Sequence, residues 1–435
     1  MSWQLALSIY GVMLLACLLG GVGIGTSIGL VGILGITLVA GTDLWLSLGD
    51  IVWNTTNNFT LVSIPLFVLM GEIILRSGIA GRFYSGVAIL LRWLPGGLAQ
   101  TNIVGCAIFS AIAGSSVATA MTVGSVAIPE MRKRGYADSL TLGTLTGGGS
   151  LGILIPPSIP MIVYASMTQV SLLDLFMAGV IPGLTLAGIF MLYVAVRVGF
   201  NSELAPRITA QPSNQQLVRA ALDSMPVIGL IAAVIGSMYF GIVTPTEAAA
   251  LGCLFALMLA SAYRELTRAR LKQALVNAAI TSGVVMFITI NAQILNFAVV
   301  TSGIGQGLAG SMVDMGLSPF MFFVLLLVIY LIVGMFIDGL SIMLLTVPLL
   351  YSSFMAMGFD GVWSGVIIVI FIELGALTPP MGLNLFAVQS IASDTSLGKV
   401  AWASMPFALI IVAFAFLMYF FPQLALWLPS AMKGA

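Results

Sequence analysis

The sequence contains no histidine and very few charged residues. Charged side chains make up 7% of its 435 residues, and 15 basic residues balance 15 acidic ones. Without histidine the chain lacks the commonest general base, a common metal ligand and the side chain that titrates near neutral pH. The balanced charge offers no basic surface to a polyanion, and we expect no nucleic-acid partner.

Cysteine is scarce, whereas apolar residues are abundant. Cys17, Cys106 and Cys253 each stand alone in an apolar stretch, without the spacing of a metal site, and we expect them to be packing residues. Hydrophobic residues make up 60% of the chain, and the mean hydropathy is +1.14. This composition is typical of an α-helical protein embedded in a lipid bilayer. The first apolar run lacks a preceding basic segment, and we expect it to be a retained span.

Long apolar stretches predict the membrane spans. Residues 43–60 are semi-polar and contain two tryptophans, which predicts a helix lying in the membrane interface. Residues 201–223 are the most polar part of the chain and contain two prolines, which predicts a cytoplasmic linker between two halves. The predicted spans lie near residues 3–21, 24–41, 61–75, 136–165, 171–197, 224–241, 245–262, 277–301, 362–392 and 400–421.

One heptapeptide pattern occurs twice, at residues 151–157 and at residues 374–380, which is 223 residues further on. Both copies read Leu-Gly-x-Leu-x-Pro-Pro and lie inside an apolar run long enough to span a bilayer. Proline removes a backbone donor and clashes with the preceding turn, so each helix should be interrupted there. The sequence therefore predicts broken helices over 136–165 and 362–392. Interrupted spans at matching positions of two halves are typical of the binding sites of secondary transporters.

Two further pairs of segments predict re-entrant helical hairpins, at 96–131 and 318–357. The first turns at Gly114 and the second at Asp338-Gly339. Gly114 precedes Gly152 by 38 residues, and Gly339 precedes Gly375 by a similar 36. The second arm of the first pair, residues 118–131, would be about 21 Å long, shorter than the roughly 30 Å hydrocarbon core. The alternative is two full spans joined by a tight turn.

The placement of basic residues predicts the orientation. With the amino terminus outside, 14 of the 15 basic residues lie on one side and only Lys433 lies opposite. That side is cytoplasmic by the positive-inside rule. The first hairpin then opens to the cytoplasm and the second to the outside, which predicts an inverted-topology repeat. The expected organisation is a scaffold over 1–60, a first repeat over 61–200, the linker, and a second repeat over 224–435.

Each hairpin and broken helix could provide a cation site and an anion site. An interrupted helix frees backbone carbonyls, which are hard ligands for a small cation, and exposes a helix amino terminus that favours a carboxylate. Serine and threonine in membrane helices also serve in close packing, which is the alternative role of these side chains. Oxygen ligands at the first tip come from Ser115, Ser116 and Thr119, and at the second tip from Asp338, Ser341 and Thr378.

Four acidic residues fall in or beside apolar stretches, where an ionisable side chain is costly and usually functional. Glu72 precedes Arg76 by four residues, so an ion pair on one helix face is an equally good interpretation. Asp338 lies at a tip and is the best candidate for cation coordination. Glu247 and Glu373 complete the group, and proton coupling through Asp338 or Glu373 stays open.

The sequence resembles the large membrane subunit of the tripartite ATP-independent periplasmic (TRAP) transporters, over essentially its whole length. The runs that carry the resemblance are SIPLFVLMGEII (63–74), GSSVATAMTVGSVAIPEMRKRGY (114–136), GGGSLGILIPPSIPMIVYA (147–165), FGIVTPTEAAA (240–250) and ELGALTPPMGLNLF (373–386). The resemblance implies an all-α polytopic fold of the ion-transporter superfamily, with two inverted repeats and an elevator-type mechanism. It implies that the protein is a sodium-driven importer of an organic anion such as a carboxylate, a sulfonate or a sialic-acid-like compound.

The resemblance also implies two protein partners and a location. One partner is a small four-helix membrane subunit, which we expect to be a separate chain, and the other is a periplasmic substrate-binding protein. The location is the bacterial inner membrane, with multiple spans. No organic cofactor is expected.

Site residues follow from the resemblance. It implies a first sodium site made of Ser115, Ser116, Gly152, Ile155 and Pro157. It implies a second sodium site made of Asp338, Gly339, Gly375, Thr378 and Pro380. Substrate is then expected between the two tips, near Ser116, Thr119, Ser158, Met381, Gly382 and Asn384.

Other functions stay open. A stand-alone sodium- or proton-coupled carrier of the same superfamily would share the hairpins but need no binding protein. A passive channel is disfavoured, because paired half-helices around one midplane site suit alternating access. An intramembrane enzyme is disfavoured because no histidine or nearby basic residue could activate the serines at the first tip, so we expect the protein not to be an enzyme.

Overall fold

The computed structural model describes residues 2–206 and 212–433, and these residues form helices without any strand. The predicted all-α fold is therefore confirmed. The first helices are α1 (Trp3–Leu19), α2 (Ile24–Ala40) and α3 (Trp45–Thr56). α3 corresponds to the helix predicted for the membrane interface, and its two tryptophans are exposed.

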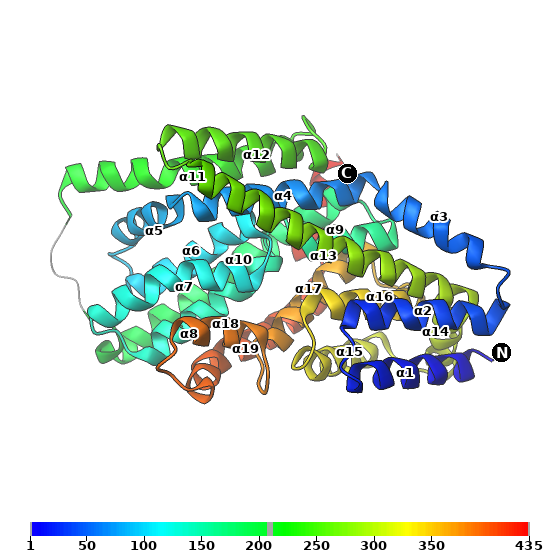
Figure 1. The fold of residues 1–435 in the computed structure, drawn as a ribbon. Helices are drawn as coiled ribbons and strands as arrows, with labels where there is room; N and C mark the ends of the chain where they lie inside the picture. Colours follow the sequence, from blue (N-terminus) through cyan, green and yellow to red (C-terminus); the bar gives the residue numbers. More distant parts are fainter. Residues whose placement is uncertain (1, 207–211, 434–435) are drawn as a thin grey trace.

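The next part of the chain contains the first hairpin and the first broken helix. A long helix and a short one come first, the hairpin and the broken helix follow, and a long helix ends the group (Figure 1). The elements are α4 (Phe59–Arg76), α5 (Ile79–Leu90), the hairpin α6 (Leu98–Ala113) and α7 (Ser116–Lys133), the broken helix α8 (Asp138–Gly149), η1 (Ser150–Ile153) and α9 (Ile159–Thr168), and α10 (Leu172–Phe200).

The second half repeats this order after two connecting helices. Its hairpin is formed by α15 and α16, and its broken helix by α17 and α18. The elements are η2 (Ser202–Leu204), α11 (Asn214–Tyr239), α12 (Pro245–Ala262), α13 (Arg268–Thr301), α14 (Ile304–Asp314), α15 (Pro319–Gly334), α16 (Gly339–Ala356), α17 (Gly361–Ala376), α18 (Leu383–Ile391), α19 (Leu397–Phe420) and α20 (Gln423–Met432).

Several predicted boundaries were wrong. Helix α11 begins at Asn214, inside the segment 201–223 predicted as linker, because Ser213 and Gln216 form a capping box. Of the rest of that segment, residues 207–211 lie outside the described residues. Helix α7 has 18 residues, about 27 Å at 1.5 Å per residue, and not the expected 14. Length therefore does not identify this arm as re-entrant; the position of its tip, beside the break of α8–α9, supports that interpretation.

Three short helices were not predicted at all: α5, α14 and α20. The first two occupy equivalent places, each between a long helix and a hairpin. Both begin directly after a Ser-Gly pair, Ser77–Gly78 and Ser302–Gly303, whose glycine has a left-handed conformation. The repeated unit therefore includes a short helix before the hairpin, in addition to the hairpin and the broken helix that the sequence indicated.

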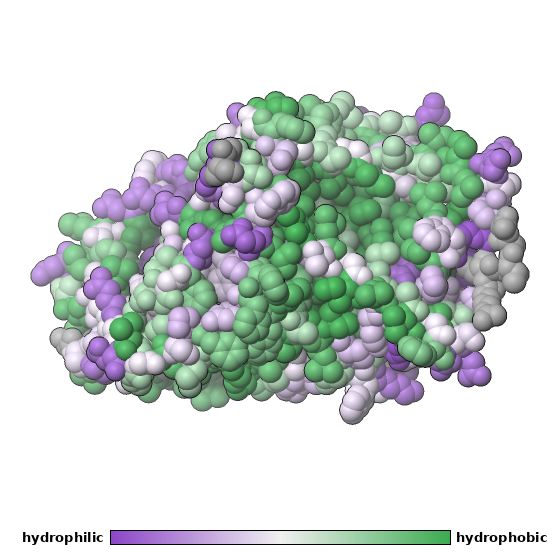
Figure 2. Space-filling model, turned by 180° about the vertical axis from the view of Figure 1, so that it is seen from behind, coloured by the Kyte–Doolittle hydropathy of each residue, from purple (hydrophilic) through white to green (hydrophobic). Residues whose placement is uncertain are grey.

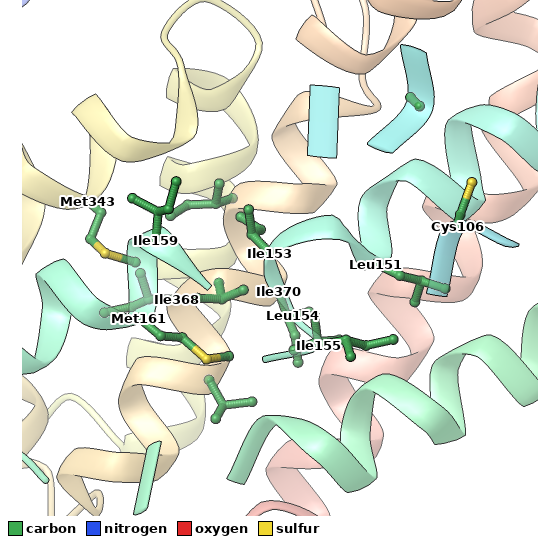
Figure 3. Packing of buried hydrophobic residues seen from close by; sticks show 14 of the residues in the cluster. Cys106, Leu151, Ile153, Leu154, Ile155, Ile159, Met161, Met343, Ile368 and Ile370 are labelled. Carbon is green, nitrogen blue, oxygen red and sulfur yellow. The ribbon is translucent and has the colours of Figure 1, made fainter. Parts of the chain in front are cut away.

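The broken helices lie at the centre of the molecule. Side chains of α17 are buried along its whole length from Trp363 to Gly375, and those of α8 and α9 are buried almost as completely. Figure 3 shows Leu154 and Ile155 of the first break near Ile370 of α17, with Leu151 on the side toward Cys106. Because the first break is buried, its interrupted backbone must be satisfied by protein groups or by a ligand, whereas the second break is exposed at Pro380 and Met381.

The outer surface suits a bilayer. Hydrophobic residues cover the middle of the molecule and hydrophilic residues gather toward its two ends (Figure 2). Within the described ranges, seven helices are long and apolar enough to cross a membrane: α4, α10, α11, α12, α13, α16 and α19. Cys106 and Cys253 are buried, Cys17 is half-buried, and all three are free thiols.

Ion pairs connect helices at the end of the molecule where the basic residues gather. Arg82 of α5 contacts Glu265 between α12 and α13 at 3.2 Å, and Arg76 of α4 donates to Gln273 of α13 at 3.0 Å. Lys433 lies elsewhere and pairs with Asp174 at the start of α10, at 2.6 Å. This separation follows the charge asymmetry of the sequence.

Candidate functional site

A cavity of about 430 Å³ lies where the two hairpin tips meet the two broken helices. Its wall contains the first residues of four helices, namely α7, α9, α16 and α18. The amino terminus of a helix carries unsatisfied N–H groups and a partial positive charge, so four such ends create a favourable environment for an anion. The remaining wall comes mainly from α4, α13 and the end of α17, with the end of α6 and η1.

The first tip lies directly against the first break. A Cβ atom on Gly152 would lie 2.4 Å from Cα and 2.6 Å from N of Ser116, so only glycine allows this approach. A Cβ atom on Gly114 would lie 3.0 Å from the carbonyl oxygen of Pro157. Ser115 caps α7 by accepting from the amide of Ala118. The structure thus brings Ser115, Ser116, Gly152 and Pro157 together, whereas the buried side chain of Ile155 packs toward α10.

The second tip has a similar arrangement with different chemistry. A Cβ atom on Gly375 would lie 2.6 Å from Cα of Gly334, which ends α15, the first arm of the second hairpin. Asp338 caps α16, and its carboxylate accepts from the amide of Ser341 at 3.1 Å. Asp338 and Gly339 line the cavity. The hydroxyl of Thr378 donates to the carbonyl of Leu374 within its own helix turn.

Only some of the residues expected to bind substrate line the cavity. Ser116 and Asn384 line the cavity. Ser158 caps α9 by accepting from Met161, and Gly382 caps α18, so both lie at helix starts beside the cavity. Met381 is half-exposed at 50%. Thr119 is buried, and its hydroxyl has no partner among the described residues.

Glu373 is a site residue that the sequence marked as an intramembrane acid and as one of two candidates for proton coupling, but not as a ligand of either sodium site. It lies on the cavity wall near the end of α17 and is 2% exposed. One carboxylate oxygen accepts from the hydroxyl of Ser116, at the tip of the other half. The second accepts from the amide nitrogen of Asn384 at 3.3 Å. This contact joins the first hairpin to the second broken helix, and no pattern within one segment could have indicated it.

The cavity wall is acidic. Glu72, Asp338 and Glu373 line it, and within the described residues no lysine or arginine does. Glu72 has its own counter-ion, Arg76 at 2.8 Å, so the predicted helical ion pair is present. An anion bound here must therefore rely on helix amino termini, hydroxyl groups and added cations.

These features define a polytopic α-helical transporter with a binding cavity between two hairpins and two broken helices. The model of the "Tripartite ATP-independent periplasmic transporter, DctM component" family matches residues 11–424, and the chain belongs to this family. The resemblance found in the sequence is thereby confirmed. The chain is thus a large component of a TRAP transporter, a multi-pass membrane protein.

Relatives of known name extend over nearly the whole chain. The C4-dicarboxylate TRAP transporter large permease protein DctM of Pseudomonas aeruginosa is 34% identical, covering 93% of this chain and 94% of its own. The 2,3-diketo-L-gulonate TRAP transporter large permease protein YiaN of Escherichia coli is 30% identical, covering 94% and 96%. The sialic acid TRAP transporter large permease protein SiaM of Vibrio cholerae is 30% identical, covering 87% and 88%.

Two solved structures share the fold at low sequence identity. The YdaH transporter of Alcanivorax borkumensis aligns over 91% of this chain and 90% of its own, with a TM-score of 0.58 and 13% identity. MtrF of Neisseria gonorrhoeae aligns over 89% and 85%, with a TM-score of 0.62 and 15% identity. At such identities the likeness concerns the fold alone.

Proposed function

We propose that this chain, as the large subunit of a TRAP transporter, imports an organic anion by sodium-coupled symport. The substrate class is a carboxylate, a sulfonate or a sialic-acid-like compound. The observation that carries the proposal is the cavity at the meeting point of two tips and two breaks, in a chain that matches the family from residue 11 to 424. Four helix amino termini face that cavity, which suits an anion.

Sodium coupling is supported by the chemistry of the two tips. Ser115 and Ser116 lie against the first break, beside Gly152 and the carbonyl of Pro157. Hydroxyl and carbonyl oxygens are ligands that suit a hard cation such as sodium. At the second tip the carboxylate of Asp338 is available beside Gly339, and Gly375, Thr378 and Pro380 belong to the adjacent break. The acidic wall requires added positive charge before an anion can enter.

An elevator movement is supported by the way that the two halves are joined. The first hairpin is bonded to the second broken helix through Ser116 and Glu373, and α9 of the first broken helix packs against α16 of the second hairpin. These four elements form one compact unit beside α4 and α13. In the proposed cycle this unit moves as a rigid body relative to those two helices and carries the cavity across the membrane.

The proposal includes two partners and a location. A small four-helix membrane subunit, as a separate chain, completes the membrane part, and a periplasmic substrate-binding protein delivers the anion. The complex lies in the bacterial inner membrane. The relatives named as TRAP permeases support this assignment.

Uptake in proteoliposomes tests the function directly. The chain is reconstituted with a small TRAP membrane subunit and a periplasmic binding protein from the same organism, and radiolabelled organic acids are offered under an inward sodium gradient. We expect uptake that requires both the sodium gradient and the binding protein. Uptake that ignores sodium contradicts symport, and uptake without the binding protein favours a stand-alone carrier.

A further inference from the structure

Glu373 is a carboxylate buried between the two halves of the protein. Its oxygens accept hydrogen bonds from Ser116, at the start of α7, and from Asn384, at the start of α18. All three residues line the central cavity, and each is at most 8% exposed. A carboxylate at such depth is costly unless a positive charge accompanies it.

Of the three acids on the wall, Glu72 alone has a cationic partner, and the most deeply buried of them, Glu373, has none within the described residues. Glu72 is paired with Arg76, and the half-exposed Asp338 accepts from the amide of Ser341 at the amino terminus of α16. Lysine and arginine are absent from the cavity lining within the described ranges. Ser116 and Asn384 are neutral donors, which stabilise a charged carboxylate only in part.

Two buried oxygen atoms, one on Asn384 and one on α7, have no partner in the described part of the chain. The amide nitrogen of Asn384 bonds to Glu373, whereas its amide oxygen is buried and has no protein partner in the described part of the chain. The hydroxyl of Thr119 is also buried and unpartnered. Thr119 follows Ser116 by three residues, so both side chains lie on the same face of α7. Unsatisfied buried oxygens are uncommon in folded proteins, and a bound ion or water is one way of satisfying them.

We propose that Glu373, Ser116 and Asn384 bind a sodium ion between the first hairpin tip and the second break, with Thr119 as a further oxygen ligand. The inference deepens the proposed sodium symport and rests on it. This site differs from both expected sodium sites, because each of those lies between a tip and the break of its own half. A single carboxylate with neutral oxygens matches a monovalent cation, whereas divalent cations generally recruit more carboxylates or keep several waters.

The site would give the ion a mechanical role. Binding neutralises Glu373 and strengthens the contact between the first tip and the second broken helix, which form the cavity together. The anion is then recognised beside a compensated carboxylate and not beside a bare one. Asn384 changes its assignment from substrate contact to cation ligand.

Sodium binding to the purified complex of this chain and its small subunit tests the site. In nanodiscs, 22Na⁺ binding is measured by scintillation proximity with N-methyl-D-glucamine as the replacement cation, for wild type and Glu373→Gln. We expect Glu373→Gln to bind one sodium ion fewer. Glu247→Gln is the matched control, because glutamine also serves in the capping box of α12, and it should bind as wild type does.

Thermal stability separates a ligand role from a structural one. Without sodium, Glu373→Gln should be at least as stable as wild type, because the substitution removes an uncompensated buried charge. Sodium should then stabilise the variant less than wild type. A variant that is less stable without sodium, yet gains as much from sodium as wild type, overturns the proposal.

A second variant and an uptake assay keep the outcomes distinct. Asn384→Ala removes one oxygen ligand, and we expect it to weaken sodium binding several-fold without changing expression. The site is overturned if both variants bind sodium with the stoichiometry and affinity of wild type. If, in addition, uptake by Glu373→Gln no longer depends on pH, Glu373 carries a proton and not a sodium ion. If wild-type uptake ignores sodium, the symport proposal fails. If wild-type uptake requires sodium and Glu373→Gln shows the same sodium dependence, this inference alone fails.

Discussion

Arg132 of α7 holds Asp394, which lies between α18 and α19, with two hydrogen bonds of 2.8 and 3.0 Å to the carboxylate. At the opposite end of α7, Ser116 donates to Glu373. One helix of the first half is thus bonded at both of its ends to the second half. The first hairpin and the second broken helix consequently form a single body, which agrees with the proposed rigid-body movement.

We expect Arg132→Gln to destabilise the protein in a pH-dependent way. Hydrogen bonding to Arg132 lowers the pKa of Asp394 below its ordinary value of 3.8. The pair therefore stabilises the folded state above that value, and the benefit is lost as the pH falls through the lowered pKa. Thermal unfolding of wild type and Arg132→Gln should differ at pH 7 and converge at acidic pH. Arg134→Gln is the control, because Arg134 pairs with Glu130 on its own helix.

Gly152→Ala should strongly reduce transport. The added methyl group would collide with backbone atoms of Ser115 and Ser116, which cannot move aside as a side chain could. Overpacking of this kind typically costs about 1 to 3 kcal/mol, and here it also separates the first tip from its break. We expect at least a tenfold loss of uptake. Gly188→Ala in α10 is the control, since no atom lies near its added Cβ; equal activity of both variants would contradict the close approach.

Asp338 combines a helix cap with a charge, and two substitutions separate these roles. Asp338→Ser keeps an oxygen that can cap α16, whereas Asp338→Ala removes the cap, at a cost of about 1 kcal/mol in typical helices. We expect Asp338→Ala to lower the melting temperature and Asp338→Ser to preserve it. Both should raise the sodium concentration needed for half-maximal uptake, because both remove the carboxylate. Unchanged sodium dependence in Asp338→Ser would limit this residue to capping.

Lys433 and Asp174 should be energetically coupled. The ion pair measures 2.6 Å and joins the end of α20 to the first turn of α10, where the Asp174 side chain is only 12% exposed. Lys433→Ala leaves the carboxylate of Asp174 without its cation. It should therefore destabilise the protein more than the double variant Lys433→Ala/Asp174→Asn does, because the double variant also removes the unpaired charge. A double-mutant cycle on thermal unfolding should give a coupling of about 0.5 to 2 kcal/mol. A value near zero would mean that the contact is solvent-screened.

The sequence was most informative where local chemistry determines structure. The Leu-Gly-x-Leu-x-Pro-Pro motifs predicted interruptions at residues 151–157 and 374–380, and α9 and α18 indeed begin as separate helices after them. The tips at Gly114 and Asp338 follow from their turn chemistry, since glycine ends α6 in a left-handed conformation and aspartate caps α16. Apolar length predicted the long helices well.

Contacts between distant segments were beyond the sequence. Glu373 and Ser116 are 257 residues apart, and periodicity reports only which face of a helix is apolar. The short helices α5 and α14 were missed because the prediction relied on apolar stretches long enough to span a bilayer, and both helices are shorter than that. Their shared Ser-Gly-Ile start, at residues 77–79 and 302–304, is a repeat that an internal comparison of the halves could have found.

The crossed arrangement of hairpins and breaks has a consequence for biosynthesis. The first tip is synthesised long before Glu373 and Asn384, because Glu373, the partner of Ser116, follows it by 257 residues. Helices inserted early must therefore remain loosely associated in the membrane until the last fifth of the chain arrives. Assembly of the cavity is in this sense a late event, and a chain truncated before α17 would present its first hairpin to the insertion machinery or to quality-control proteases.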